Sequence, residues 1–412
     1  MTSRRVRSID PIRVVLVVIG GLALCWLSIA VTMSNVATGA SPLLALRVWP
    51  WSSSAASALA EQDIVTATAR SQEEARYYAS DALARSPVDA RAARVLGLFD
   101  ALRARNRAAQ FAFYYAQRLS RRDLPTQMWL IEQSVDQNDI PSALSHYHIA
   151  MRTSQTSRAI LIPVLADAAE NPAVAKPLAQ LLRQRPNWWL DFYDSAVPKI
   201  SSPISLALIV SALHFNPADP LEGARLRQGM QRLVALDAVD AAYHIYRKAF
   251  VAQNQAAVLI RNGGFESGVG LPPFDWQFSD SPDHQGIIEP RDGSHGSAAL
   301  SIAGTSSGEV ARELLMLPPG QYKLSFLIGA VRGDATQHPD AMIVCLRGAE
   351  ILAFRFPATP TPQVITKTLG IPDKACRTQW LIISSNGSSE VSDPPWIDDI
   401  TIRAVGRSVG RS

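Results

Sequence analysis

The chain has 412 residues, which is too long for one ordinary domain and suggests two or three. With 47% apolar and 18% charged residues, it has the composition of a folding chain, which excludes disorder over most of its length. The net charge of +4 is uneven, because residues 258–405 carry 11 basic and 16 acidic side chains, so no domain is basic enough to predict nucleic-acid binding.

Val14 to Met33 is a run of twenty residues without a charge. A helix of this length spans about 30 Å, the thickness of a bilayer's hydrocarbon core. Four Arg lie between residues 4 and 13, and no charge follows the run until Arg47. The positive-inside rule therefore predicts a single transmembrane helix over 14–33, with residues 1–13 as a basic cytoplasmic N-terminus.

A cleaved signal peptide is the alternative, because Thr38-Gly39-Ala40 ends in small residues suited to a peptidase. Twenty apolar residues exceed the usual core of a signal peptide, which favours the anchor. Arg outnumbers Lys 34 to 6, as in GC-rich bacteria, so we expect a single-pass protein of a bacterial inner membrane with its bulk in the periplasm. Residues 34–56, which hold Pro42 and Pro50, are predicted to form a linker.

Residues 57–257 are rich in Ala, Leu and Arg, which favours helices. Small and aromatic residues recur there with a period of 34: Ala75, Ala79 and Ala82, then Ala109, Phe113 and Ala116, then Ala143, Tyr147 and Ala150. With Leu96-Gly97 in the first helix of one unit, the pattern resembles the tetratricopeptide repeat family. The resemblance implies an α-solenoid of helix pairs whose concave face binds protein partners.

At Leu259 the composition changes to Gly, Ser, Pro and Asp with short apolar runs, which is typical of an antiparallel β-sandwich. We expect this domain to cover 258–405, followed by a tail at 406–412. The predicted strands are Ala298–Ile302, Tyr322–Ile328, Ala341–Leu346, Ile351–Phe356, Trp380–Ser384 and Ile397–Ile402.

Characteristic segments mark both ends of this region. Asn262-Gly263-Gly264-Phe265-Glu266 opens it, Phe274-Asp275-Trp276 and His295-Gly296 follow, and Trp396-Ile397-Asp398-Asp399-Ile400 closes it. The pattern resembles the jelly-roll carbohydrate-binding modules. In that family the first and last strands lie side by side, and a structural calcium often lies nearby. The resemblance implies Glu266 and one of Asp398 or Asp399 as calcium ligands, since calcium prefers oxygen donors. Alternatively, these carboxylates accept hydrogen bonds from loop amides.

Aromatic faces stack on sugar rings in this family, and the tryptophans available here are Trp276, Trp380 and Trp396. These three are the predicted ligand-binding residues, although family members usually keep the equivalents of Trp276 and Trp396 as core or rim structure. Jelly rolls of this type also serve as plain adhesion or spacer domains.

Two of the three cysteines, Cys345 and Cys376, fall in the β region. An oxidising compartment permits a bridge between them. We expect them to be either paired or both buried.

The chain has no Gly-x-Ser-x-Gly elbow, P-loop, dinucleotide fingerprint or HExxH helix, so we predict no catalytic or cofactor-binding residue. The sequence favours a non-enzymatic, membrane-anchored scaffold that faces protein partners and glycan, in envelope or extracellular polysaccharide assembly or export. There are two alternatives. One is a pure protein-interaction scaffold with a non-binding β domain, and the other is a glycan-active enzyme.

Overall fold

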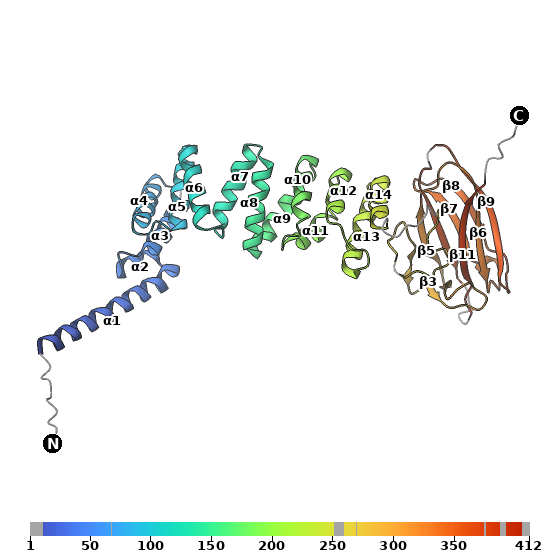
Figure 1. The fold of residues 1–412 in the computed structure, drawn as a ribbon, viewed down its shortest axis with the longest axis horizontal. Coiled ribbons are helices and arrows are strands. Elements are labelled where there is room, and N and C mark those ends of the chain that lie inside the picture. Colours follow the sequence, from blue (N-terminus) through green and yellow to red (C-terminus); the bar gives the residue numbers. More distant parts are fainter. Residues whose placement is uncertain are drawn as a thin grey trace, which may run out of the picture. The chain divides into compact units, whose positions relative to one another are not determined.

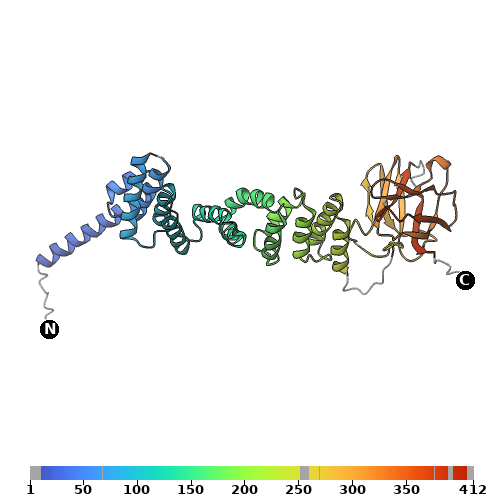
Figure 2. The same cartoon turned by 90° about the horizontal axis from the view of Figure 1, so that it is seen from above.

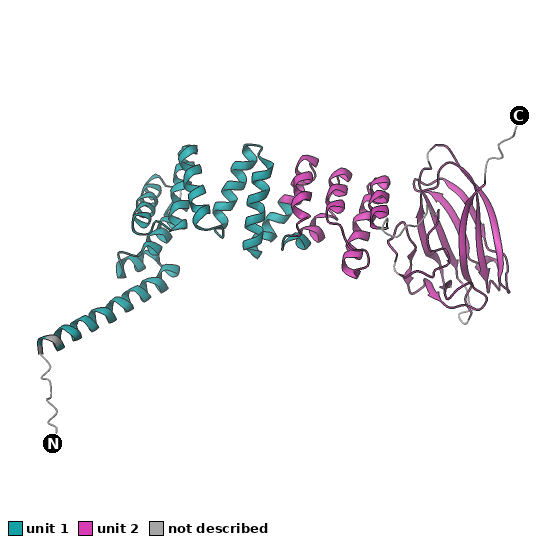
Figure 3. Ribbon diagram, in the orientation of Figure 1, with its two compact units in different colours: residues 1–164, 186–191 teal, residues 165–185, 192–412 magenta. Residues whose placement is uncertain are grey.

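The computed structural model describes residues 11–66, 68–250, 259–268, 270–374, 376–387 and 393–405. The first ten residues of the predicted cytoplasmic segment and the predicted tail 406–412 lie outside these ranges. The chain divides into two compact units, Met1–Val164 with Pro186–Asp191, and Leu165–Arg185 with Phe192–Ser412 (Figure 3).

Along the described chain, helices come first and strands follow (Figures 1 and 2). The α-helices of the described residues are α1 (Pro11–Ala40), α2 (Pro42–Val48), α3 (Ser53–Val65), α4 (Ala69–Arg85), α5 (Ala90–Leu102), α6 (Asn106–Leu119), α7 (Leu124–Asp136), α8 (Ile140–Thr153), α9 (Gln155–Ala168), α10 (Pro172–Leu182), α11 (Trp189–Ala196), α12 (Pro203–Ala212), α13 (Pro220–Ala235) and α14 (Val239–Phe250).

Among the described residues, α1 is the one helix long and apolar enough to cross a membrane, over Val14–Ala40. Its length and composition are those of a membrane span, and a signal sequence near an N-terminus can share them. The predicted span 14–33 lies within it.

The prediction that residues 34–56 form a linker needs correction, because most of this segment is helical. Helix α1 continues to Ala40, α2 follows, and α3 begins at Ser53. Pro42 occupies the first turn of α2, where its missing N–H removes no helical hydrogen bond. Ser41 and Ser52 cap α2 and α3 by accepting hydrogen bonds from backbone N–H groups of their first turns.

The 34-residue pattern has a packing counterpart in α4, α6 and α8, whose repeated residues are all buried. A Cβ at position 97 would lie 2.8 Å from Cδ2 of Phe113, so Gly97 allows α5 and α6 to pack closely. The N-caps of α5 and α7, Asp89 and Asp123, also lie 34 residues apart. The local packing expected of the repeat is present, and the tetratricopeptide resemblance itself stays a prediction.

The strands form two antiparallel sheets. They are β1 (Gln277–Phe278), β2 (Asp280–Ser281), β3 (His284–Glu289), β4 (Ala299–Gly304), β5 (Ser307–Leu315), β6 (Gly320–Gly329), β7 (Asp340–Cys345), β8 (Glu350–Arg355), β9 (Gln363–Ile371), β10 (Gln379–Asn386) and β11 (Trp396–Ala404). A five-stranded sheet has the order β1-β5-β10-β7-β8, and a six-stranded sheet the order β2-β3-β4-β11-β6-β9.

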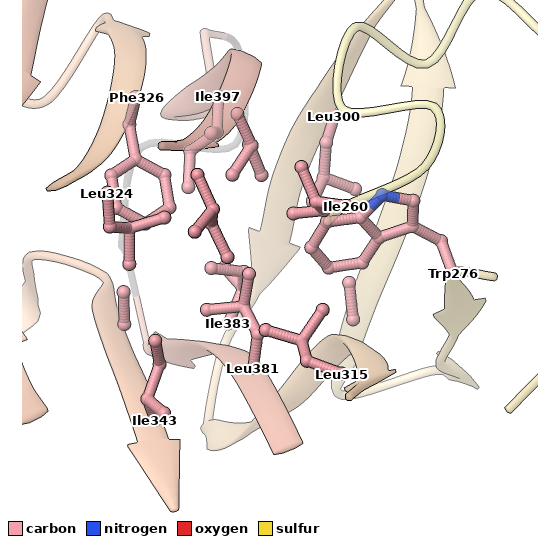
Figure 4. Packing of buried hydrophobic residues seen from close by; sticks show 14 of the residues in the cluster. Ile260, Trp276, Leu300, Leu315, Leu324, Phe326, Ile343, Leu381, Ile383 and Ile397 are labelled. Atoms are coloured by element: carbon pink, nitrogen blue, oxygen red, sulfur yellow. The ribbon is translucent and has the colours of Figure 1, made fainter. Parts of the chain in front are cut away.

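The hydrophobic core lies between these two sheets (Figure 4). Leu300, Leu324 and Phe326 of the six-stranded sheet share one buried cluster with Ile343 and Leu381 of the five-stranded sheet. Side chains alternate along each strand, so every second residue of β10 is buried and the residues between them face outward. The region is therefore a β-sandwich with one outward face on the five-stranded sheet.

Cys345, at the end of β7, forms a disulfide with Cys376, just before β10, with the two Cα atoms 5.1 Å apart. Both side chains are also buried. The prediction that these cysteines are paired or buried is confirmed, and the bridge ties two neighbouring strands of the five-stranded sheet.

The opening segment of the sandwich is held against its last strand. Ile400 N donates a hydrogen bond to Gly263 O at 2.9 Å, and a Cβ at position 263 would overlap the Ile400 carbonyl oxygen. Asn262 has φ +50° and is fixed by its own side chain, which accepts from Ser267 N and donates to Ser267 O. The Asn-Gly residues of the opening motif therefore have a structural role.

Candidate functional site

The outward face of the five-stranded sheet carries one aromatic ring among paired polar side chains. We call this face the platform, and its residues come from β1, β5, β10, β7 and β8: Gln277, Arg312, Asp340, Arg355, Trp380 and Asn386. The five strands place these side chains on one surface because each occupies an outward position in its register.

Trp380 lies on the central strand of the sheet, β10, and is half-buried. The guanidinium carbon of Arg312, on the neighbouring strand β5, lies 4.7 Å from the centroid of its ring. A cation over an indole face at this distance is attracted by the ring's quadrupole, which fixes the orientation of both groups. The platform therefore has a preoriented aromatic centre.

Polar groups flank Trp380 on its β5 side. Arg312 Nε and Nη2 both donate to Gln277 Oε1 at 3.2 Å, and Nε also lies 3.3 Å from Glu309. Both members of the Arg312–Glu309 pair are partly exposed, so the pair contributes little stability and its hydrogen-bonding groups face solvent.

A second polar group is formed by side chains of β10, β7 and β8. Arg355 Nε donates to Asp340 Oδ1 at 2.9 Å, and Asn386 Nδ2 donates to Asp340 Oδ2 at 2.7 Å. Hydrogen bonding to Asp340 holds the pKa of Arg355 above its usual value, so Arg355 carries its charge at neutral pH. The two polar groups together pair each cation with a carboxylate.

The structure corrects the other two predicted ligand-binding tryptophans. Trp276 is 4% exposed and belongs to the main core, where its ring lies 5.4 Å from that of Phe265. Trp396 is 3% exposed and packs in a smaller cluster against β6, where Gly329 leaves room for its indole. Trp276 points into the main core, whereas Trp396 alternates with the core residue Ile397 and is buried on the opposite side of the six-stranded sheet. Both side chains are therefore buried.

The predicted calcium ligands converge on the loop before β4. Glu266 accepts hydrogen bonds from Ser297 N, Ser297 Oγ and Ala298 N, at 2.7, 2.5 and 3.0 Å. These bonds, the one from the Ser297 side chain first, hold its pKa below the usual value. Glu266 is thus ionised and already satisfied by protein donors.

Asp398 and Asp399 reach the same loop from β11. Asp398 is buried and accepts from His295 N at 2.8 Å and from Asp399 N at 2.7 Å, while Asp399 Oδ2 contacts His295 Nδ1. Burial raises the pKa of Asp398, against the effect of these hydrogen bonds. The described residues contain no group of three or more His, Cys, Asp or Glu placed to hold a metal. These contacts are those of the loop-amide alternative, and calcium stays a prediction.

Sequence reasoning missed one buried carboxyl group, Glu313 of β5. It points into the sandwich between Ala311 and Leu315, and its Oε1 accepts from Arg261 N at 3.1 Å. Oε2 has no hydrogen-bond partner among the described residues. Burial raises its pKa well above the usual value, and the nearby Asp275 adds to this. Because Glu313 is sealed from solvent, it cannot reach a substrate as a general acid.

A groove of about 720 Å³ lies on helices α10, α12 and α14. Apolar side chains and three cations line it, including Lys176, Arg183, Ile204, Leu208, Ala241 and Lys248. Within the described part of the chain, no acidic residue lines the groove. The lining of the groove is therefore mainly apolar and carries positive charge.

No family model matches the sequence, and no curated protein matches it. Solved structures resemble part of the chain. The enzymatically active domain of bacteriophage CBA120 tailspike protein 4 is 12% identical over 36% of this chain and 21% of that one, with a TM-score of 0.27. The chain thus spans about a fifth of that protein's length.

Two binding modules are matched over nearly their whole length. A structure described as Family 16 Carbohydrate Binding Module-2 is 15% identical, over 35% of this chain and 99% of that one, with a TM-score of 0.28. The module TmCBM61, solved with β-1,4-galactotriose, is 18% identical, over 36% of this chain and 100% of that one, also with a TM-score of 0.28. With likenesses this distant, function has to be inferred from the geometry of the platform itself.

Proposed function

We propose that the chain is a non-enzymatic scaffold, anchored in a bacterial inner membrane by α1, whose β-sandwich binds glycan on the platform. Its helices bind protein partners, and its setting is the assembly or export of envelope or extracellular polysaccharide.

One observation carries the glycan assignment, the half-buried Trp380 held by Arg312 at the centre of a polar face. Sugar rings present apolar C–H faces that pack on an indole, and hydroxyl groups around the ring that need donors and acceptors. The platform offers both within one surface. Arg312 and Gln277 lie on one side of the ring, and Asp340 and Asn386 belong to the polar group across β7.

The experiment is glycan-array screening of the full chain in detergent, followed by calorimetry on the best ligand. Trp380→Ala should weaken binding by about 30-fold, since the loss of a central aromatic anchor costs about 2 kcal/mol. Trp380→Phe should lose less, because it keeps a ring face. Phe111→Ala, which removes an exposed aromatic of α6, is the matched control.

Each alternative predicts a different result. A pure protein-interaction scaffold would bind no glycan on the array, or would bind equally well after Trp380→Ala. A glycan-active enzyme would turn over the bound oligosaccharide, and a carboxylate substitution would abolish that turnover while leaving binding intact.

A second interaction is favoured by the groove on α10, α12 and α14. Its apolar lining and its cations Lys176, Arg183 and Lys248 fit an acidic, amphipathic segment of a partner protein. Lys176→Glu with Lys248→Glu should abolish capture of such a peptide, and added salt should weaken the capture by wild type. Lys199→Glu, an exposed cation of the same unit outside the groove, should change nothing.

The periplasmic location is supported by the Cys345–Cys376 disulfide, since such bridges persist in oxidising compartments. The anchor is favoured over a cleaved signal peptide by the helical state of Thr38-Gly39-Ala40. These residues continue α1, whose end packs on α2 and α3.

A further inference from the structure

The end of α1 and the short helix α2 form a packed turn. Ser34 Oγ donates to Ala45 O at 3.2 Å, and Ser34, Ala30 and Ala45 are all buried. Ala30 and Ser34 are four residues apart, so they lie on one face of α1. Because Ser34 precedes the turn and Ala45 follows it, α2 lies beside the last turns of α1, as Figure 1 shows.

The opposite side of this turn is apolar and exposed. We call it the elbow, and it consists of the exposed Leu43, Leu44, Val48 and Trp51 with the half-buried Trp49. Leu44 is 52% exposed and Trp51 is 68% exposed. The Trp49 and Trp51 rings meet edge to face with centroids 5.2 Å apart. Contiguous apolar surface of this kind marks an interaction site in a folded protein.

We propose that the elbow inserts into the lipid interface at the C-terminal end of the membrane span, an inference that rests on the proposed anchoring by α1. The apolar surface of α1 is exposed along its length and the elbow continues it, since α2 lies against the turns where α1 ends. Tryptophan is enriched at this depth, because its ring is apolar while its N–H reaches the headgroups.

The single charge of the segment agrees with this position. Arg47 is exposed on α2, and no other charged residue occurs between Arg13 and Glu61. A lone cation on an apolar helix can extend to lipid phosphates while its stem stays among the acyl chains. The elbow would thus hold the start of the helical array at the membrane surface.

Spin labels on the full chain, reconstituted in phosphatidylcholine–phosphatidylglycerol vesicles, test this directly. The native Cys25, exposed on α1, reports on the anchor. With Cys25→Ser as background, Leu44→Cys and Leu43→Cys report on the elbow. Val88→Cys, at an apolar position that is 74% exposed in the helical array, is the aqueous control. Collision rates with oxygen and with a water-soluble nickel complex give the depth of each label.

We expect labels at 43 and 44 to collide with the nickel complex several-fold less often than the label at 88, at a depth shallower than Cys25. Elbow labels as accessible to nickel as position 88, with Cys25 still deep, would overturn the proposal and leave the anchor intact. A Cys25 label open to nickel would overturn the anchor itself. A third outcome is that the elbow labels collide with neither oxygen nor the nickel complex, and become accessible when the protein is diluted with additional lipid. That result would show that a second copy of the chain covers the elbow, and it would overturn the lipid assignment.

Discussion

Arg312 and Trp380 lie on adjacent strands of the five-stranded sheet, with the guanidinium carbon 4.7 Å from the indole centroid. The register sets Trp380 opposite Leu314 and Arg312 opposite Ile382, so the pair is diagonal and the long Arg side chain crosses to the ring. Trp380 is half-buried, and the proposed glycan would cover the part of its side chain that remains exposed.

Arg312→Lys should lower glycan affinity by about three- to tenfold, or about 0.7–1.4 kcal/mol. Lysine keeps the charge and loses the planar group that packs on Trp380 and donates to Gln277. The free energy of unfolding should change by less than about 1 kcal/mol, because the pair is partly exposed. Calorimetry and denaturant titration measure both quantities. Arg403→Lys, on the other sheet, should leave affinity unchanged, and an equal loss there would exclude a specific role of Arg312.

Removing the disulfide by a double change, Cys345→Ala with Cys376→Ala, should destabilise the β-sandwich by about 3–5 kcal/mol. The bridge closes a loop of 31 residues, and such loops restrict the unfolded chain by about this much. Thermal unfolding with and without reductant gives the same comparison on the wild type. A melting temperature insensitive to both treatments would mean that the bridge contributes nothing to stability.

Glu313→Gln should stabilise the protein at pH 8 and much less at pH 5. Burial raises the pKa of Glu313 in the folded state, so the unfolded chain loses its proton first as pH rises. The free energy of unfolding should therefore fall above about pH 4.5, the usual pKa of a glutamate, until the raised folded value is reached. Urea titrations across this range should show the slope in wild type and in the partly exposed control Glu309→Gln. A wild type without the slope would contradict the raised pKa.

A structural calcium at Glu266, Asp398 and Asp399 predicts a higher melting temperature with calcium than with chelator, and little effect of magnesium. Glu266→Gln should remove that difference. Hydrogen bonds alone predict identical curves in calcium and chelator. In that case Glu266→Gln should lower both curves at neutral pH and have little effect at low pH, because the depressed pKa of Glu266 stabilises the fold only while it is ionised.

A phosphatase reporter fused after Thr66, at the end of α3, should be active in the periplasm, and a reporter that works only in the cytoplasm should be silent there. This follows from the Arg-rich sequence before α1 and the charge-free sequence after it. The reverse pattern would overturn both the location and the choice of glycan as a partner.

The sequence pattern predicted those strands in which apolar and polar residues alternate or a short apolar run stands between turn residues. Strands β4, β6, β7, β8, β10 and β11 all overlap predicted strands. Strand β5 was missed because its charged residues Glu309, Arg312 and Glu313 break the alternation that identifies a half-buried strand. Strand β9 at a sheet edge was missed as well, since only Leu369 and Ile371 at its end are buried.

The candidate site was predictable only as a set of residue types. The sequence named three tryptophans, and only the register of β10 makes Trp380 face outward while Trp276 and Trp396 are buried. The sequence did not indicate a role for Arg312. That role depends on a diagonal contact with Trp380 on the neighbouring strand, and the two residues are 68 positions apart in sequence. The motifs at the two ends of the β region did predict one feature correctly. They placed Glu266 close to Asp398 and Asp399, and all three contact the same loop.

The bond from Ile400 to Gly263 joins positions 137 residues apart, and β11 lies in its sheet between β4 and β6. The six-stranded sheet is therefore incomplete until β11 has been made, whereas each helix from α1 to α8 contacts the next helix in sequence. Local contacts form quickly and distant ones slowly, so these helices can acquire structure while the rest of the chain is still being synthesised. The sandwich must wait as an open, edge-exposed sheet until its final strand arrives, which makes this interval the time of greatest exposure to aggregation and to proteases.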